Sequence, residues 1–280
     1  MNIMVTGAAG GYGHYAVDYV KKFAPESEVY GLVRNAEDAA VLESKGIHAR
    51  IGDYADKSSL ISAFAGIDRL LFVSVPVHDL QKNVVEAAGE AGISFIAYTS
   101  LHDPQYAKFG LEINHLQTEA IIQKTGIPHS FLRNCWYLEM AAPLAETALK
   151  TGRFPYYAGE AKVSWALKSE LAEAGARVIT GNGYDEVLEL AGDPVSYKEI
   201  GEAAQTLTDK KIEIMAVDRD EFSHLMAGSG IDNLGLMLGT AYQDYAAAGN
   251  NGEDDSSSVT FVKVLGHPLT PLAEALRKII

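Results

Sequence analysis

A glycine-rich turn stands near the start of the chain, between an apolar run at 2–6 and a stretch with helical spacing at 11–23. Its residues Gly7, Gly10 and Gly13 have the spacing G-x-x-G-x-x-G. A backbone without Cβ atoms can bend sharply there and can admit a phosphate to the free N–H groups of a helix N-terminus. Gly7 would make the turn, Gly10 would admit the phosphates and Gly13 would let the helix pack closely. The pattern predicts a dinucleotide site, and the alternative is a tight strand–helix turn without a ligand.

The coenzyme type is predicted from the end of the second apolar run, EVYGLV (28–33). Sites that prefer NAD usually carry an acidic residue there to hold the ribose 2′-hydroxyl. This chain has Arg34 instead, and a guanidinium matches the oxygens of a 2′-phosphate. The residue therefore predicts NADP(H), and the alternative is an exposed arginine at a strand end.

Other cofactor contacts are expected where the third, fourth and fifth strands end, because ligands of such folds bind at the carboxyl ends of the strands. The predicted cofactor-binding residues are Gly7, Ala9, Gly10, Gly11, Tyr12, Gly13, Arg34, Asp53, Tyr54, Val73, Ser74, Val75, Thr99 and Ser100.

Strand-like and helical patterns alternate over the first half of the chain. Strands are expected at 2–6, 28–33, 48–51, 69–75, 94–100 and 129–133, and helices at 11–23, 36–45, 57–65, 80–92 and 111–126. Strands with few polar positions, separated by helices, indicate a parallel sheet covered on both faces. The predicted fold class is α/β, with a doubly wound parallel (Rossmann) sheet.

The rhythm loosens after about residue 135. Helical stretches near 137–150, 168–179 and 196–208 alternate with β runs at 186–192 and 211–217. They predict a smaller C-terminal α+β lobe. The expected domains are an NADP-binding domain at 1–134 and a substrate-cleft lobe at 135–280, interleaved with the first. The polar segment 249–258 is expected to be a mobile loop.

Composition narrows the function classes. The 280 residues are 48% hydrophobic and 21% charged, as in an ordinary soluble globular protein. A net charge of −14 argues against non-specific nucleic-acid binding. No apolar run reaches the roughly 18 residues that suggest a membrane span. A single cysteine, Cys135, excludes an internal disulfide. The start MNIMVTG shows no secretory signal, so the expected location is cytoplasmic.

Several motifs resemble those of one family and are spread over almost the whole chain. They are VTGAAGGYG, GLVRN, GDYAD, LLFVS, FIAYTS, HLQTE, FLRNCWYLE, LELAGDPVSYKEI and LGHPLTPLAEAL. Together they resemble the NmrA-like family of atypical short-chain dehydrogenases/reductases, and within it bacterial NADPH-dependent quinone oxidoreductases and triphenylmethane-dye reductases. The resemblance implies NADPH binding, flavin-free reduction of quinone-like acceptors and frequent homodimers. The segment VPVHDLQKN is shorter than in some relatives, which affects the acceptor pocket.

The catalytic residues are predicted from this resemblance. It places His115 beside the nicotinamide ribose, and Asn134 and Tyr137 at the substrate cleft. The alternative for His115 is a surface histidine on a helix. No tyrosine has a lysine four residues later, so the acid catalysis of ordinary short-chain dehydrogenases is unsupported. Because a hydroquinone anion delocalises its charge, water or a nearby histidine can protonate it later. The protein would then act mainly by positioning the reactants.

The remaining candidates have structural alternatives. Aromatic residues that either stack on a flat acceptor or belong to the core are Tyr106, Phe109, Trp136, Tyr137 and Trp165. Cys135 is expected to be buried and inert. The acidic residues at 253–255 are expected in a solvated loop, and no metal site is predicted.

The sequence thus predicts an NADPH-dependent oxidoreductase that transfers a hydride to quinone-like, flat conjugated acceptors. Proteins of the NmrA-like family also include redox sensors that bind a dinucleotide and a protein partner with little or no turnover. The missing Tyr–Lys pair fits both functions. Reduction of ordinary sugar or lipid carbonyls is a third alternative.

Overall fold

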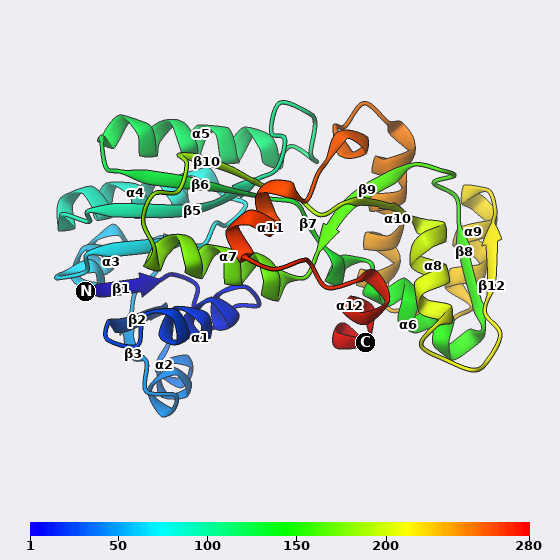
Figure 1. Cartoon of the computed structure of the whole chain (residues 1–280), viewed down its shortest axis with the longest axis horizontal. Coiled ribbons are helices and arrows are strands. Elements are labelled where there is room, and N and C mark those ends of the chain that lie inside the picture. The colour runs from blue at the N-terminus through cyan, green and yellow to red at the C-terminus, as the bar shows by residue number, and fades with distance from the viewer. The chain divides into compact units, whose positions relative to one another are not determined.

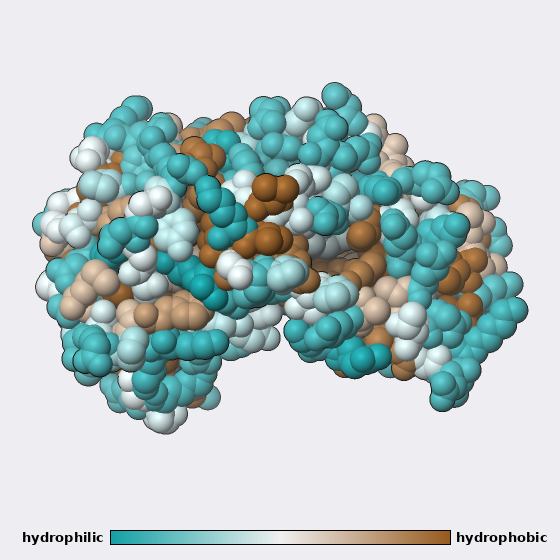
Figure 2. Space-filling model, viewed as in Figure 1, coloured by the Kyte–Doolittle hydropathy of each residue, from teal (hydrophilic) through white to brown (hydrophobic).

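The computed structural model describes residues 1–280, which form two compact units. Unit 1 comprises Met1–Asn134, Ser169–Leu190 and Thr260–His267, and unit 2 comprises Cys135–Lys168, Ala191–Val259 and Pro268–Ile280 (Figure 1). Hydrophilic residues cover most of the face seen in Figure 2, with smaller apolar patches between them. No helix combines the length and the apolar character needed to cross a membrane.

Unit 1 is built on a seven-stranded sheet in the order β10-β6-β5-β4-β1-β2-β3. The strands are β1 (Asn2–Val5), β2 (Glu28–Val33), β3 (His48–Ile51), β4 (Arg69–Phe72), β5 (Phe95–Leu101), β6 (His129–Asn134) and β10 (Val187–Leu190). Every neighbouring pair is parallel. From β1 the chain first builds towards β3 and then returns to place β4 on the other side of β1. The prediction of a doubly wound α/β fold is confirmed, and the strand order reverses between β1 and β4.

Helices cover both faces of this sheet. They are α1 (Gly13–Phe23), α2 (Ala36–Ser44), α3 (Lys57–Phe64), α4 (His78–Ala91), α5 (Leu111–Thr125), α7 (Lys168–Thr180) and α11 (Val259–Leu265). Figure 1 shows α3, α4 and α5 on one side of the sheet and α1 and α7 on the other. Since successive side chains of a strand point to opposite faces, Met4 and Phe131 join the core under α3 to α5. Leu132 on the other face lies close to Gly175 of α7.

Two segments in the second half of the chain lie in a different part of the fold from the one that the sequence predicted. The run predicted at 186–192 was assigned to the smaller lobe, but its strand β10 pairs with β6 and extends the main sheet. The helix predicted at 168–179 is α7, which packs in unit 1 apart from its first residue. A local hydrophobic pattern predicts the type of an element but not which part of the fold it packs in, so both placements depended on the tertiary structure.

Unit 2 combines short strands with helices. Its elements are β7 (Trp136–Tyr137), η1 (Leu138–Met140), α6 (Ala142–Thr151), β8 (Arg153–Tyr156), β9 (Lys162–Ala166), β11 (Pro194–Ser196), α8 (Tyr197–Gln205), β12 (Glu213–Ala216), α9 (Arg219–Ala227), α10 (Asn233–Ala248), η2 (Glu253–Asp255) and α12 (Leu272–Ile279). The strands form a three-stranded sheet in the order β11-β9-β7 and a separate β12-β8 pair. Sequence patterns missed β7, β8, β9, β11, α9 and α10, because few of them have a clear period.

Candidate functional site

The glycine-rich turn connects β1 to α1 and has little room for side chains. Gly7 adopts a positive φ of 58°, which favours glycine. A Cβ on Gly13 would lie 2.1 Å from the carbonyl oxygen of Gly7, and one on Gly10 would lie 3.2 Å from it. Gly13 therefore lets α1 begin directly against the turn itself. The N-cap of this helix, Tyr12, makes no side-chain cap, and the first turn has no acidic residue, so the N-terminus is suited to an anion.

A cavity of about 480 Å³ opens beside this turn at the carboxyl ends of the central strands. We call it the glycine cavity. Its lining residues are Gly7, Ala9, Gly10, Gly11, Tyr12, Gly13, Leu32, Val33, Arg34, Asp38, Gly52, Asp53, Tyr54, Val73, Ser74, Val75 and Leu80. Twelve of the fourteen residues predicted to bind the cofactor line it, and Thr99 and Ser100 do not. It lies where the strand order reverses, the usual ligand position in open α/β sheets.

The ends of β2 and β3 supply the polar groups on one side of the glycine cavity. Arg34 is exposed, and its guanidinium makes no hydrogen bond or ion pair within the protein. Asp53 accepts a hydrogen bond from the backbone N–H of Ala55 at 2.8 Å. The hydroxyl of Tyr54 lies 2.5 Å from Thr6 Oγ1 and donates to the carbonyl oxygen of Val73 at 2.8 Å. Tyr54 thus braces β1 against the segment after β4, and burial raises its pKa.

The segment after β4 is fixed by side chains from β5 and α4. Thr99 Oγ1 accepts from the backbone N–H of Ser74 at 2.8 Å and donates to Ser74 Oγ at 3.0 Å. The N–H of Val75 donates to Gln81 Oε1 at 3.2 Å. Ser100 instead donates to Glu119 at 2.6 Å. Thr99 therefore does not line the cavity but fixes the position of Ser74, which does. Direct cofactor contacts by Thr99 and Ser100 stay predictions.

His115 lies on α5 and is buried, which contradicts the alternative of a surface histidine. Its Nδ1 is 2.9 Å from the hydroxyl of Tyr98, which in turn lies 3.1 Å from Gln81 Oε1. Gln81 Nε2 donates to Thr118 Oγ1, so its Oε1 must accept from Tyr98. The hydroxyl oxygen of Tyr98 then accepts from Nδ1–H of His115, and Nε2 is left as a hydrogen-bond acceptor. Burial lowers the pKa of His115 to about 4, so the ring is neutral near pH 7.

Comparison with known proteins agrees with this geometry. The model of the NmrA-like family matches residues 1–264. The chain belongs to the NmrA-like family. It is 35% identical over 284 residues to quinone oxidoreductase 2 of Escherichia coli (strain K12), covering 98% of this chain and 97% of that protein.

Solved structures of two relatives have the same fold. The triphenylmethane reductase of Citrobacter sp., complexed with NADP(H), is 31% identical with a TM-score of 0.89, and each chain is fully covered. The Escherichia coli NADPH-dependent quinone oxidoreductase complexed with NADPH is 33% identical with a TM-score of 0.85, over 99% of each chain.

The two other predicted catalytic residues of this NmrA-like protein lie in different units. Asn134 ends β6 in unit 1; it is 4% exposed, and neither its Nδ2 nor its Oδ1 has a hydrogen-bond partner. Tyr137 belongs to β7 in unit 2, where the ammonium of Lys168 lies 5.1 Å from the centre of its ring. Their catalytic roles stay predictions. Of the two residues, Asn134 is the stronger candidate for ligand binding, because its buried amide is unpaired.

The aromatic residues of unit 2 pack mainly against one another. The ring of Tyr242 lies 5.2 Å from that of Trp136 and 5.1 Å from that of Trp165, and Tyr245 lies 5.7 Å from Trp136. We call these four residues the aromatic cluster. Trp136 and Trp165 are buried, which favours a core role for both. In unit 1, Phe109 is half-exposed and has a positive φ of 60°, a costly conformation for an aromatic residue.

The segment 249–258 differs from the expected mobile loop. Glu253 is 1% exposed and accepts hydrogen bonds from Trp136 Nε1 at 3.0 Å, the hydroxyl of Tyr245 at 2.5 Å and the N–H of Ser164 at 2.8 Å. The prediction of a solvated acidic run is therefore wrong for this residue. Three converging donors stabilise the buried carboxylate, a feature that composition does not reveal.

Cys135 is buried as predicted, and burial raises the pKa of its thiol to about 12.

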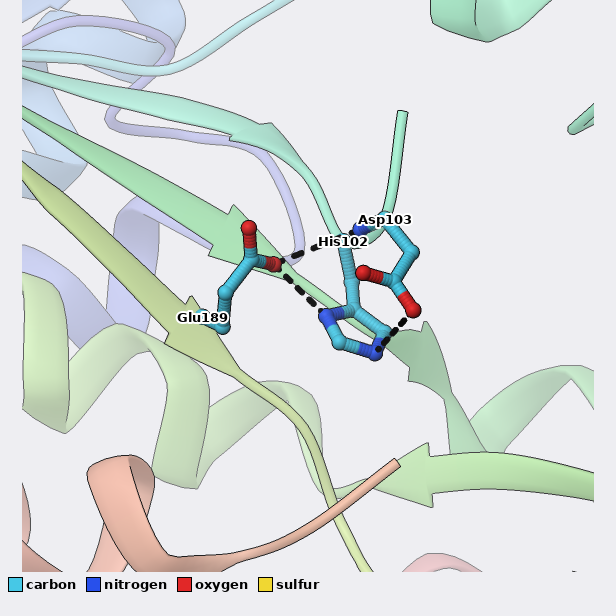
Figure 3. A group of neighbouring side chains, drawn as sticks. All are labelled: His102, Asp103 and Glu189. Atoms are coloured by element: carbon cyan, nitrogen blue, oxygen red, sulfur yellow. Dashed lines mark hydrogen bonds and ion pairs between the residues drawn. The ribbon is translucent and has the colours of Figure 1, made fainter. Parts of the chain in front are cut away.

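Sequence patterns did not predict an ion-pair network that lies at the ends of β5, β6 and β10. His102 Nδ1 lies 2.7 Å from Glu189 Oε2, and its Nε2 lies 3.5 Å from Asp103 Oδ2 (Figure 3). Arg133 contacts Glu189 Oε1 at 3.0 Å and Glu119 at 2.7 Å. Because both oxygens of Glu189 already bind basic side chains, we interpret the group as an ion-pair network. Charged residues at the ends of neighbouring strands were the available signal.

Proposed function

We propose that this protein is an NADP(H)-dependent oxidoreductase that transfers a hydride to quinones or similar flat conjugated acceptors without a flavin. The glycine cavity is the observation that carries the proposal. It combines a turn too tight for side chains, an uncapped helix N-terminus and the unpaired guanidinium of Arg34. These groups fit a pyrophosphate and a 2′-phosphate. The names of the relatives, a quinone oxidoreductase and a triphenylmethane reductase, support flat conjugated acceptors.

The chain's own residues would bind and position the reactants. Bound NADPH would supply the hydride. Nε2 of His115, as an acceptor, suits a ribose hydroxyl, which would orient the nicotinamide. At neutral pH this ring has no Nε2 proton to donate, so protonation of the reduced acceptor falls to water. Protonation by water is sufficient because the charge of a hydroquinone anion is delocalised, so the anion does not need a proton at once.

Asn134 is the candidate for contact with the acceptor. Leaving a buried polar group unpaired costs about 1–3 kcal/mol, and such a group in a native structure calls for a functional reason. Its Nδ2 would donate to a carbonyl oxygen of the acceptor, and its Oδ1 would accept from the hydroxyl formed on reduction.

The test is a turnover assay with purified protein, NADPH and a small quinone, followed at 340 nm. We expect quinone-dependent oxidation that is lost in Arg34→Glu, because the new carboxylate repels the 2′-phosphate. Arg277→Glu makes the same charge change at an exposed position in unit 2 and should keep activity. A panel of simple ketones should give little turnover. Tight NADP(H) binding without turnover of any acceptor would overturn the proposal in favour of a redox sensor.

A further inference from the structure

The glycine cavity carries two opposite charges close together in sequence. Arg34 directly follows β2, and Asp38 lies in the first turn of α2. Both residues line the cavity, and both follow the strand whose end usually selects the coenzyme. An acidic coenzyme-selecting residue is expected at the strand end, whereas Asp38 comes four positions after Arg34 and lies on the helix.

Asp38 is hydrogen-bonded to Asn35, the N-cap residue of its own helix. Asn35 Nδ2 donates to Asp38 Oδ2 at 2.9 Å, and the N–H of Asp38 donates to Asn35 Oδ1 at 2.8 Å. No ion pair joins Arg34 to Asp38 in the structure. An acidic residue in the first turn also suits the helix dipole, so a purely structural role is the competing explanation for Asp38. Asp38 is also half-buried in the cavity wall, so its charge acts on a molecule bound in the cavity as well as on the helix.

The two side chains discriminate oppositely between coenzymes. A 2′-phosphate carries between one and two negative charges near pH 7, so Arg34 attracts it and Asp38 opposes it. A free 2′-hydroxyl can donate a hydrogen bond to a carboxylate, as in sites that prefer NAD. We propose that Asp38 opens the glycine cavity to NADH alongside NADPH by accepting from the 2′-hydroxyl and by weakening the hold on the 2′-phosphate. This inference rests on the proposed dinucleotide function of the cavity.

The experiment isolates the adenosine end of the coenzyme. Titration calorimetry compares 2′,5′-ADP with 5′-AMP, two probes that differ only by the 2′-phosphate. In Asp38→Asn we expect 2′,5′-ADP to bind roughly threefold to tenfold more tightly, because a like charge is removed at a partly exposed site. Binding of 5′-AMP should weaken about twofold to fivefold, because a neutral acceptor makes the weaker hydrogen bond.

Two further variants separate the coenzyme role from helix capping. Asp38→Glu keeps the charge and should stay near the parent in the ratio of the two affinities. Glu37→Gln removes a neighbouring charge that does not line the cavity and should change that ratio by less than about twofold. Thermal melting of each variant checks that α2 remains folded. Steady-state kcat/KM values for NADH and NADPH should move in the same directions as the probe affinities.

The outcomes keep this inference distinct from the function on which it rests. If neither probe nor either coenzyme binds the parent protein, the dinucleotide function itself fails. If 2′,5′-ADP binds and the affinity ratio is the same in Asp38→Asn as in the parent, only the role of Asp38 is overturned. An equal change of the ratio in Glu37→Gln would also overturn it, because the effect would then be general surface charge.

Discussion

Two charged groups, Arg34 at the glycine cavity of unit 1 and Glu253 beside the aromatic cluster of unit 2, differ in how they are paired within the protein. At the cavity, the guanidinium of Arg34 makes no hydrogen bond or ion pair within the protein. At the aromatic cluster, Glu253 is buried and accepts from three donors. A polar group that is fully paired inside the protein stabilises the fold, whereas one left unpaired has its binding capacity free for a ligand. Substitutions in the two regions should therefore affect different measurements.

The largest effect is expected at the aromatic cluster. Glu253→Ala would leave the donors of Trp136, Tyr245 and Ser164 without their acceptor. We expect the free energy of unfolding to fall by about 3–5 kcal/mol, measured by denaturant titration with tryptophan fluorescence. Asp254→Ala, at an exposed neighbouring position, should change it by less than about 0.5 kcal/mol. Equal effects of the two substitutions would contradict the distinction between the regions.

His115 lies between the unpaired Arg34 and the fully paired Glu253, because only one of its two ring nitrogens has a hydrogen-bond partner. Its pKa is lowered from 6.5 to about 4 in the folded protein. The unfolded chain therefore binds a proton first as the pH falls. The resulting stability is fully present above pH 6.5, is lost as the pH falls towards 4, and amounts to about 3 kcal/mol.

Unfolding titrations between pH 7 and pH 4 measure this dependence. In His115→Gln the slope over that window should shrink by the contribution of one group. His224→Gln is the control substitution, because it removes an exposed histidine. A parent slope that persists in His115→Gln would exclude the buried neutral ring.

The tight turn itself should be sensitive to a single methyl group. In Gly13→Ala the new Cβ would meet the carbonyl of Gly7, so α1 must shift away from the turn. We expect NADPH to bind about thirtyfold more weakly, or ~2 kcal/mol, in line with overpacking elsewhere. Gly89→Ala places a Cβ in open space on α4 and should keep full affinity while stabilising the protein slightly. Unchanged binding in Gly13→Ala would break the link between the turn and the coenzyme.

The smallest change in stability is expected at Asn134, where it should oppose the change in activity. Asn134→Leu replaces an unpaired buried amide by an apolar side chain of similar size. We expect the free energy of unfolding to rise by about 1 kcal/mol and kcat/KM for the quinone to fall about tenfold. A loss of stability with full activity would show that the amide has a structural partner and no role at the acceptor.

Much of unit 1 could be predicted from the sequence because its signals are local. The alternation of apolar runs with helical patterns gave the parallel sheet, and the glycine spacing gave the turn. Both depend on backbone sterics and on side-chain periodicity, which act over a few residues. The lining of the glycine cavity by Arg34, Asp53, Tyr54 and the segment after β4 followed from one topological rule. The assignment of separate roles to 1–134 and 135–280 stays a prediction.

Other features depended on residues that are distant in sequence. The pairing of β10 with β6, the hydrogen bond from Trp136 to Glu253 and the contact of His102 with Glu189 each join positions at least 50 apart. Asp38 reached the cavity only because α2 returns beside β2. The sequence by itself determined which segments are strands and helices and where a dinucleotide could meet bare backbone. Only the tertiary structure decided which polar groups are paired, because the partners that satisfy a buried charge come from other elements of the fold.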